Sequence, residues 1–91
     1  MKKRKSKNLM YPELDTVATG HRIGHLMQEK HLCIKDVSRV MNVSYQAVYR
    51  WLRGETLPTI GNFYTLSQLM RTDVDDMLVA KERTDGDLRS V

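Results

Sequence analysis

The chain has 91 residues, of which 41% are hydrophobic and 29% are charged, and its formal net charge is +4. This size suits one compact domain with a single core, and the composition excludes collagen-like, disulfide-rich and wholly disordered chains. The single cysteine, Cys33, rules out an internal disulfide and favours a reducing compartment, so we expect a cytoplasmic protein. No apolar run approaches the roughly 20 residues of a membrane span, which predicts no membrane association.

Basic residues are concentrated at the start of the chain. Residues 2–7 carry five positive charges and no acid, so the rest of the chain sums to −1. The apolar stretch of an export signal does not follow them. We expect residues 1–10 to form a flexible arm that either contacts nucleic acid or stays solvated, because the lysine-rich start has no apolar residue to bury. Residues 81–91 should fray, which leaves 11–80 as the folded domain.

Apolar residues recur at spacings of three and four, which predicts an all-α domain with five helices and no strand. Asp15 or Thr16 can cap a first helix over about 15–30. Its apolar stripe consists of Ile23, Leu26 and Met27. Gly20 and Gly24 each cost about 1 kcal/mol relative to alanine inside a helix. They therefore indicate either a later start of this helix or a close helix crossing.

Two shorter helices follow, over about 34–41 and 44–52, and a tight turn joins them. Asn42 tolerates the left-handed conformation at the end of a helix, and Ser44 is a favourable N-cap for the next one. Gly54 marks the end of the third helix. The apolar side of the second helix consists of Val37, Val40 and Met41.

The last two helices are expected over about 59–70 and 73–80. The apolar face of the fourth consists of Ile60, Phe63, Leu66, Leu69 and Met70. Asp73 can cap the fifth helix, and Asp75 and Asp76 suit its positive N-terminus. The apolar residues of the fifth helix are Val74, Met77 and Leu78.

The segment from Leu32 to Gly54, LCIKDVSRVMNVSYQAVYRWLRG, followed by Leu57 and Pro58, closely resembles the Cro/phage-repressor (XRE) helix-turn-helix family. The resemblance spans roughly residues 20–78. Its landmarks are Arg22, Ile23, Val37, Ser38, Asn42, Val43, Ser44, Val48, Trp51, Gly54 and Pro58. It implies a compact five-helix domain whose third helix lies in the major groove of double-stranded DNA, while the second crosses the sugar-phosphate backbone.

Helical geometry then divides the third helix into two sides. A step of about 100° per residue turns Val48 and Trp51 toward the core. The residues left outside are Tyr45, Gln46, Tyr49, Arg50 and Arg53. Gln46 can pair with adenine and Arg50 with guanine through two hydrogen bonds each. We therefore predict that bases are read by Tyr45, Gln46, Tyr49 and Arg50, and that the DNA backbone is bound by Lys35, Ser44 and Arg53. The balance of +3 over residues 35–54 suits a polyanionic partner.

The chain departs from the family in the second helix and in the core. Ile34 stands where the family often has a glutamine that binds phosphate, and Lys35 is the natural substitute. Cys33 is a poor replacement for the usual serine or threonine N-cap, so weaker anchoring of this helix is expected. Met27 and Leu52 replace a buried arginine and acid of some phage repressors, and such an exchange is often neutral or stabilising.

These patterns predict a sequence-specific transcriptional regulator, a repressor rather than an activator, which binds double-stranded DNA without a cofactor or metal. An enzyme is not expected, because His21, His25 and His31 lack a nucleophile arrangement or a zinc-ligand motif. We expect a homodimer whose interface involves the fifth helix, with Met70 as a further candidate. Two alternatives stay open: an antitoxin whose main partner is a toxin protein, and an accessory regulator of a mobile element.

Overall fold

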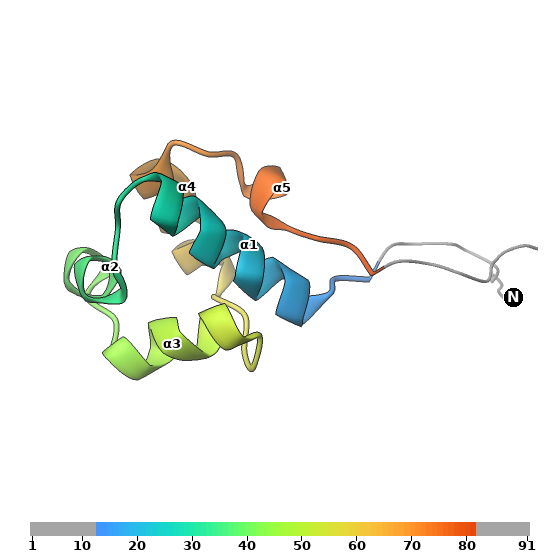
Figure 1. Ribbon diagram of the computed structural model, residues 1–91, viewed down its shortest axis with the longest axis horizontal. Helices are drawn as coiled ribbons and strands as arrows, with labels where there is room; N and C mark the ends of the chain where they lie inside the picture. The colour runs from blue at the N-terminus through green and yellow to red at the C-terminus, as the bar shows by residue number, and fades with distance from the viewer. Residues whose placement is uncertain (1–12, 82–91) are drawn as a thin grey trace, which may run out of the picture.

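The computed structural model describes residues 13–81, and five helices account for most of them (Figure 1). The helices are α1 (Thr16–Glu29), α2 (Ile34–Met41), α3 (Tyr45–Arg53), α4 (Ile60–Met70) and α5 (Val74–Met77). This confirms the all-α prediction. The expected basic arm and all but one residue of the expected C-terminal tail lie outside the described residues. Within residues 13–81, no helix is long and apolar enough to cross a bilayer.

The helix limits agree with the predicted ones to within one residue, except at the end of α5. This helix was expected to reach residue 80 but stops at Met77, after which Leu78 is already extended (ψ 134°). The reason is competition from the segment before α1. The backbone N–H of Asp15 donates to the Val79 carbonyl (2.8 Å), and Leu14 and Ala80 form an isolated antiparallel bridge that the sequence did not predict.

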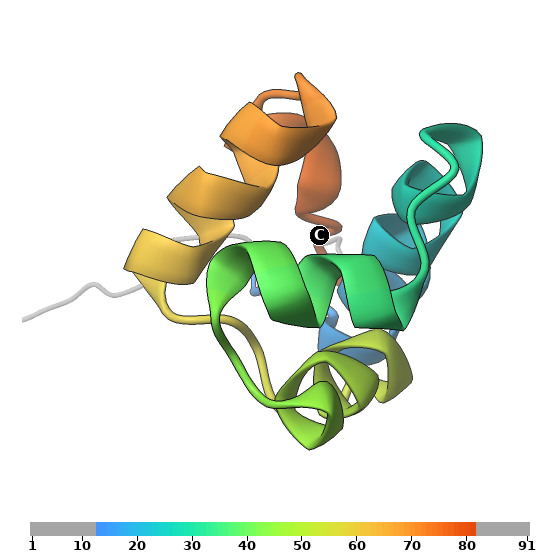
Figure 2. The ribbon, with the colours of Figure 1, turned by 90° about the vertical axis from the view of Figure 1, so that its left-hand side faces the viewer.

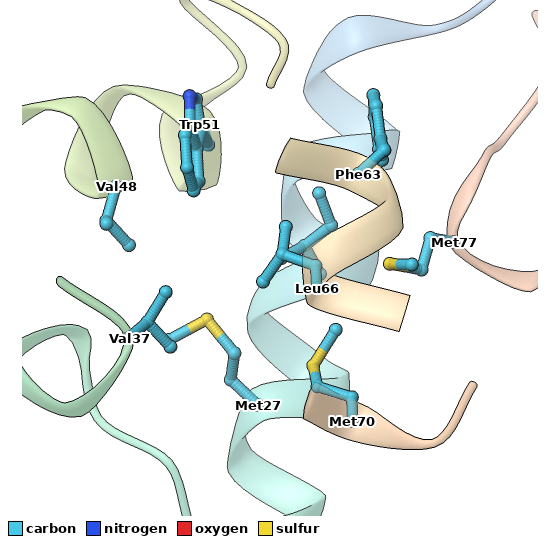
Figure 3. Close-up of a cluster of buried hydrophobic side chains, with 9 residues drawn as sticks. Met27, Val37, Val48, Trp51, Phe63, Leu66, Met70 and Met77 are labelled. Carbon is cyan, nitrogen blue, oxygen red and sulfur yellow. The ribbon is translucent and has the colours of Figure 1, made fainter. Parts of the chain in front are cut away.

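The core lies between the helices, and every helix contributes to it (Figure 3). Its buried apolar side chains are Ile23, Met27, Val37, Val48, Trp51, Phe63, Leu66, Met70 and Met77. For two residues the prediction of a core position is wrong. Val40 is 56% exposed, because α2 packs on the core through the stripe of Ile34, Val37 and Met41, and Val40 lies beside that stripe. Ile60 is 88% exposed, because it is the first residue of α4 and precedes the part of that helix that packs.

Burial also corrects the expected dimer interface. Met70 and Met77 are both 0% exposed, so neither can meet a second subunit without unfolding the domain. Val74 and Leu78 are half-buried and pack against the same core. The apolar residues of α5 are therefore used within the domain.

The two glycines of α1 lie on the side of the helix that crosses α3. A Cβ atom built on Gly20 would overlap with the carbonyl oxygen of Trp51 and lie 3.0 Å from the backbone nitrogen of Gly54. A Cβ on Gly24 would meet only the Leu52 side chain, at 3.6 Å. Since α1 begins at Thr16, the later start is wrong and the close helix crossing is confirmed.

Side-chain caps account for where most helices begin. Asp15 accepts a hydrogen bond from the backbone N–H of Ala18 (2.9 Å), so Asp15 rather than Thr16 caps α1. Thr59 does the same for α4 through the N–H of Asn62 (3.2 Å). Asp73 occupies the N-cap position of α5, but its side chain makes no capping bond, so that expectation is wrong.

Candidate nucleic-acid interface

The turn between α2 and α3 has the conformation that the sequence predicts (Figure 2). Asn42 is left-handed, with φ 57° and ψ 46°, which lets α2 end and the chain reverse. Ser38 then ties the turn back to α2 twice. Its hydroxyl donates to the carbonyl of Val43 (2.6 Å), and its own carbonyl accepts from the Val43 N–H (3.1 Å). These bonds fix the angle between the two helices.

Both ends of α3 are closed by local hydrogen bonds. The Ser44 hydroxyl accepts from the backbone N–H of Ala47 (2.9 Å), which confirms Ser44 as the N-cap. Gly54 ends the helix with φ 76°, and its N–H donates to the Trp51 carbonyl (3.0 Å). A side chain at Gly54 would also come within 2.5 Å of the Val17 Cα atom. Glycine is therefore required both by the backbone conformation and by the approach of α1.

One side of α3 is buried and the other is open. Val48 is 0% exposed and Trp51 is 4% exposed, as the 100° step predicts. The opposite side consists of the exposed residues Tyr45, Gln46, Tyr49, Arg50 and Arg53, which we call the outer face of α3. Neither the Gln46 side chain nor the Arg50 side chain forms a hydrogen bond or ion pair with another residue among 13–81. The structure thus brings together all four residues expected to read bases.

Of the residues expected to bind the DNA backbone, Arg53 belongs to the outer face, whereas Ser44 and Lys35 lie outside it. Ser44 is exposed at the start of α3, and Arg53 is exposed at its end. Lys35 is exposed in the first turn of α2 and lines an open hollow of about 630 Å³ together with Tyr45. Met27 and Leu52 line the same hollow, and both belong to the apolar core and its immediate surroundings. Lys35 and the start of the outer face therefore border one depression.

The start of α2 is held differently from what the sequence suggested. The Asp36 carboxylate accepts both the backbone N–H of Cys33 (2.9 Å) and its thiol (3.1 Å). These bonds, the one to the backbone first, hold the pKa of Asp36 below its usual value, and Arg39 and Lys35 act in the same direction. Cys33 alone is a poor N-cap. The Asp36 carboxylate nevertheless anchors the start of α2 through its two hydrogen bonds with Cys33.

Sequence reasoning missed an acid at the end of the outer face. The Oε2 atom of Glu55 lies 2.9 Å from Nε of Arg53, and the Arg53 guanidinium lies 5.5 Å from the centroid of the Tyr49 ring. Side-chain hydrogen bonding with Tyr49 and then the charge of Glu55 raise the pKa of Arg53. The charge count over residues 35–54 ended one residue too early. Including Glu55 lowers the balance from +3 to +2.

The histidines lie apart from the outer face and are exposed. His25 pairs with Glu29 on α1 (3.4 Å), and His21 and His31 also face solvent. The part of the chain that the structure describes contains no group of three side chains able to hold a metal ion.

Comparisons with known proteins identify the family. A family model described as helix-turn-helix matches residues 23–77, more than half of the chain. The restriction-modification controller protein C.AhdI from Aeromonas hydrophila superposes with a TM-score of 0.64 at 19% identity, over 69% of this chain and 96% of its own. The P22 c2 repressor protein superposes with a TM-score of 0.62 at 27% identity, over 66% of this chain and 91% of its own. No protein with a curated description matches significantly. The chain belongs to the XRE-type helix-turn-helix family.

Proposed function

We propose that this protein is a sequence-specific regulator of transcription that binds double-stranded DNA through the outer face of α3 and represses by occupying its site. One observation carries the proposal. Val48 and Trp51 are buried in the core, and Gln46 and Arg50 therefore lie side by side on the opposite, exposed surface of α3. A single exposed helix of this kind fits the major groove.

The chemistry of the outer face suits bases at its centre and phosphates at its ends. The Gln46 amide can bond to N6 and N7 of adenine, and the Arg50 guanidinium can bond to O6 and N7 of guanine. Tyr45 and Tyr49 offer an aromatic ring to thymine methyl groups and a hydroxyl to phosphate. Lys35 on α2 and Arg53 at the C-terminal end of α3 supply positive charge to phosphates, and the Ser44 hydroxyl supplies a hydrogen bond. These contacts carry no sequence information.

The comparisons support the same proposal. The P22 c2 repressor was solved in complex with a synthetic operator, so a protein with this fold and 27% identity to the chain binds DNA. The likeness to the controller protein C.AhdI, at 19% identity, supports the fold alone.

We expect two copies to bind two half-sites, because one module reads few base pairs and proteins with this motif pair across a two-fold axis. Since the apolar residues of α5 pack against the core of their own domain, the exposed apolar residues Ile60 and Tyr64, one turn apart on α4, are the candidates for contact between the copies. Light scattering on the protein with and without DNA tests this. Dimers of the native chain that become monomers in Ile60→Lys support the assignment, and a monomer in every condition contradicts it.

The proposed function is tested by selecting bound duplexes from a random pool. We expect Gln46→Ala and Arg50→Ala each to lose roughly 1–3 kcal/mol of binding free energy and to relax the preference at one position. Arg50→Lys keeps the charge but loses the fork of donors, so it should relax the same position. Lys35→Ala should weaken all duplexes about equally. Gln68→Ala, an exposed glutamine on α4, is the matched control.

The outcome is clear in either direction. Selection of one shared sequence motif by the native protein, with altered preference in the Gln46 and Arg50 variants only, supports the proposal. If the native protein enriches no motif, or if all variants enrich the same motif with the same affinity, the assigned roles are wrong.

A further inference from the structure

At the C-terminal end of the outer face, the acidic residue Glu55 lies close to Arg53, which is expected to bind DNA phosphate. Glu55 holds Nε of Arg53 at 2.9 Å, and the guanidinium lies over the ring of Tyr49. The backbone N–H of Glu55 donates to the carbonyl of Arg50 (3.0 Å), which fixes the Glu55 backbone directly beyond the last turn of α3. The side chain therefore starts from a fixed point beside the outer face.

This geometry changes what Arg53 offers to a phosphate. A guanidinium has two edges that can each bind an oxyanion with two parallel hydrogen bonds, and Glu55 occupies the Nε atom of one of them. A phosphate can still bind at the other edge, but it then shares one positive charge with the carboxylate. The two anions repel each other across the guanidinium, so the contact is weaker than that of a free arginine.

The position of Glu55 within the surface makes this effect specific. Between Ile34 and Asn62 the only acids are Asp36 and Glu55. Asp36 is occupied by Cys33 at the start of α2. Glu55, with its side chain 49% exposed, is therefore the acid that faces the same solvent as Arg53, whose side chain is 57% exposed.

We infer that Glu55 sets the strength of sequence-independent DNA binding by partly neutralising Arg53, so that the domain binds phosphates more weakly than its arginines alone would allow. The inference rests on the proposed function and assigns to Glu55 the role of lowering the affinity for DNA. Because a phosphate contact carries no sequence information, Glu55 weakens the binding of every duplex in the same proportion.

The test is Glu55→Gln, which keeps an oxygen that can accept from Nε of Arg53 but removes the charge. Affinity is measured as a function of salt concentration for a selected duplex and for a duplex of unrelated sequence. We expect tighter binding of both by the same factor and a log-log salt slope steeper by up to about 0.9, the value for one further neutralised phosphate. Asp75→Asn, on α5 and across α1 from α3 (Figure 1), makes the same change in net charge and should leave the slope unchanged.

A double variant shows whether Glu55 acts through Arg53. In an Arg53→Ala background, Glu55→Gln should lose most of its effect on affinity. An equal effect in both backgrounds would show that Glu55 repels the duplex by itself, which overturns the inference. Thermal unfolding by circular dichroism checks that each variant is folded.

Other outcomes are equally decisive. Weaker binding by Glu55→Gln, or an unchanged slope, overturns the inference, because Glu55 would then position Arg53 or have no role. A gain confined to the selected duplex also overturns it, because Arg53 would then read a base. In each of these cases the native protein still binds DNA, so the proposed function stands. If the native protein binds neither duplex, the proposed function itself fails.

Discussion

Replacing Gly20 with alanine should destabilise the domain, although glycine is normally the weaker residue inside a helix. Gly20 lies where α1 crosses α3, and an added Cβ atom would overlap with the Trp51 carbonyl oxygen and lie 3.0 Å from two further backbone atoms of α3 and its C-cap. Backbone atoms cannot move aside by changing rotamer. The two helices must therefore separate to accept the methyl group.

The magnitude follows from two opposing terms. Removing a glycine from a helix interior gains about 1 kcal/mol. Overpacking a well-packed interior costs typically about 1–3 kcal/mol, and contacts with backbone atoms belong at the upper end of this range. The net loss for Gly20→Ala is then about 2 kcal/mol. For a domain of this size, such a loss lowers the melting temperature by roughly 8–16 °C.

Gly24→Ala is the matched control, because it makes the same substitution one turn later on the same side of α1. Its Cβ atom would make ordinary contact with Leu52 at 3.6 Å, so the gain of about 0.5–1 kcal/mol is expected without the cost. Urea and thermal unfolding, followed by circular dichroism, measure both variants. A Gly20→Ala protein that is as stable as the native chain would refute the close crossing, and equal effects at both positions would refute the explanation from contact distances.

Three further predictions concern α2 and the turn that follows it. Because the pKa of Asp36 is depressed below 3.8, its carboxylate stabilises the fold above that pH, and the stability difference between the native chain and Asp36→Asn should shrink as pH falls through the folded pKa. Urea titrations at several pH values measure this difference, and one that grew on acidification would contradict the assignment. Ser38→Ala should lose about 0.5–1.5 kcal/mol of unfolding free energy, because the Val43 carbonyl loses its hydroxyl donor. At Asn42, glycine should be tolerated, whereas valine should cost about 1–2 kcal/mol in the left-handed conformation. Equal stability of the two Asn42 variants would show that the turn is not restrained.

Sequence reasoning predicted the outer face of α3 well because the period of an α-helix determines which residues share a side. Once Val48 and Trp51 are assigned to the core, the 100° step leaves no freedom for Gln46 and Arg50. The ends of α3 were equally accessible, since Ser44 and Gly54 have local preferences that act through neighbouring backbone groups. Such features depend on residues within one or two turns of each other.

Most features that sequence reasoning missed depend on contacts between residues far apart in the chain, or on where along a helix the packing against the core begins. The length of α5 is decided by Asp15, which binds the Val79 carbonyl and draws the chain out of the helix. Ile60 continues the apolar pattern of α4, but the pattern does not reveal where packing begins. Glu55 was missed for another reason. It follows the glycine that ends the helix, and a charge count bounded by the helix does not include it.

The structure separates the residues that place the outer face of α3 from those that compose it. Trp51 fixes the rotation of α3, Ser38 fixes its angle to α2, and Gly20 fixes its distance from α1. None of these three is expected to touch DNA, yet each determines where Gln46 and Arg50 lie. Changes at the first group should therefore lower stability and DNA affinity together, whereas changes at Gln46 or Arg50 should lower affinity while leaving the melting temperature unchanged, because neither side chain is bonded to another described residue.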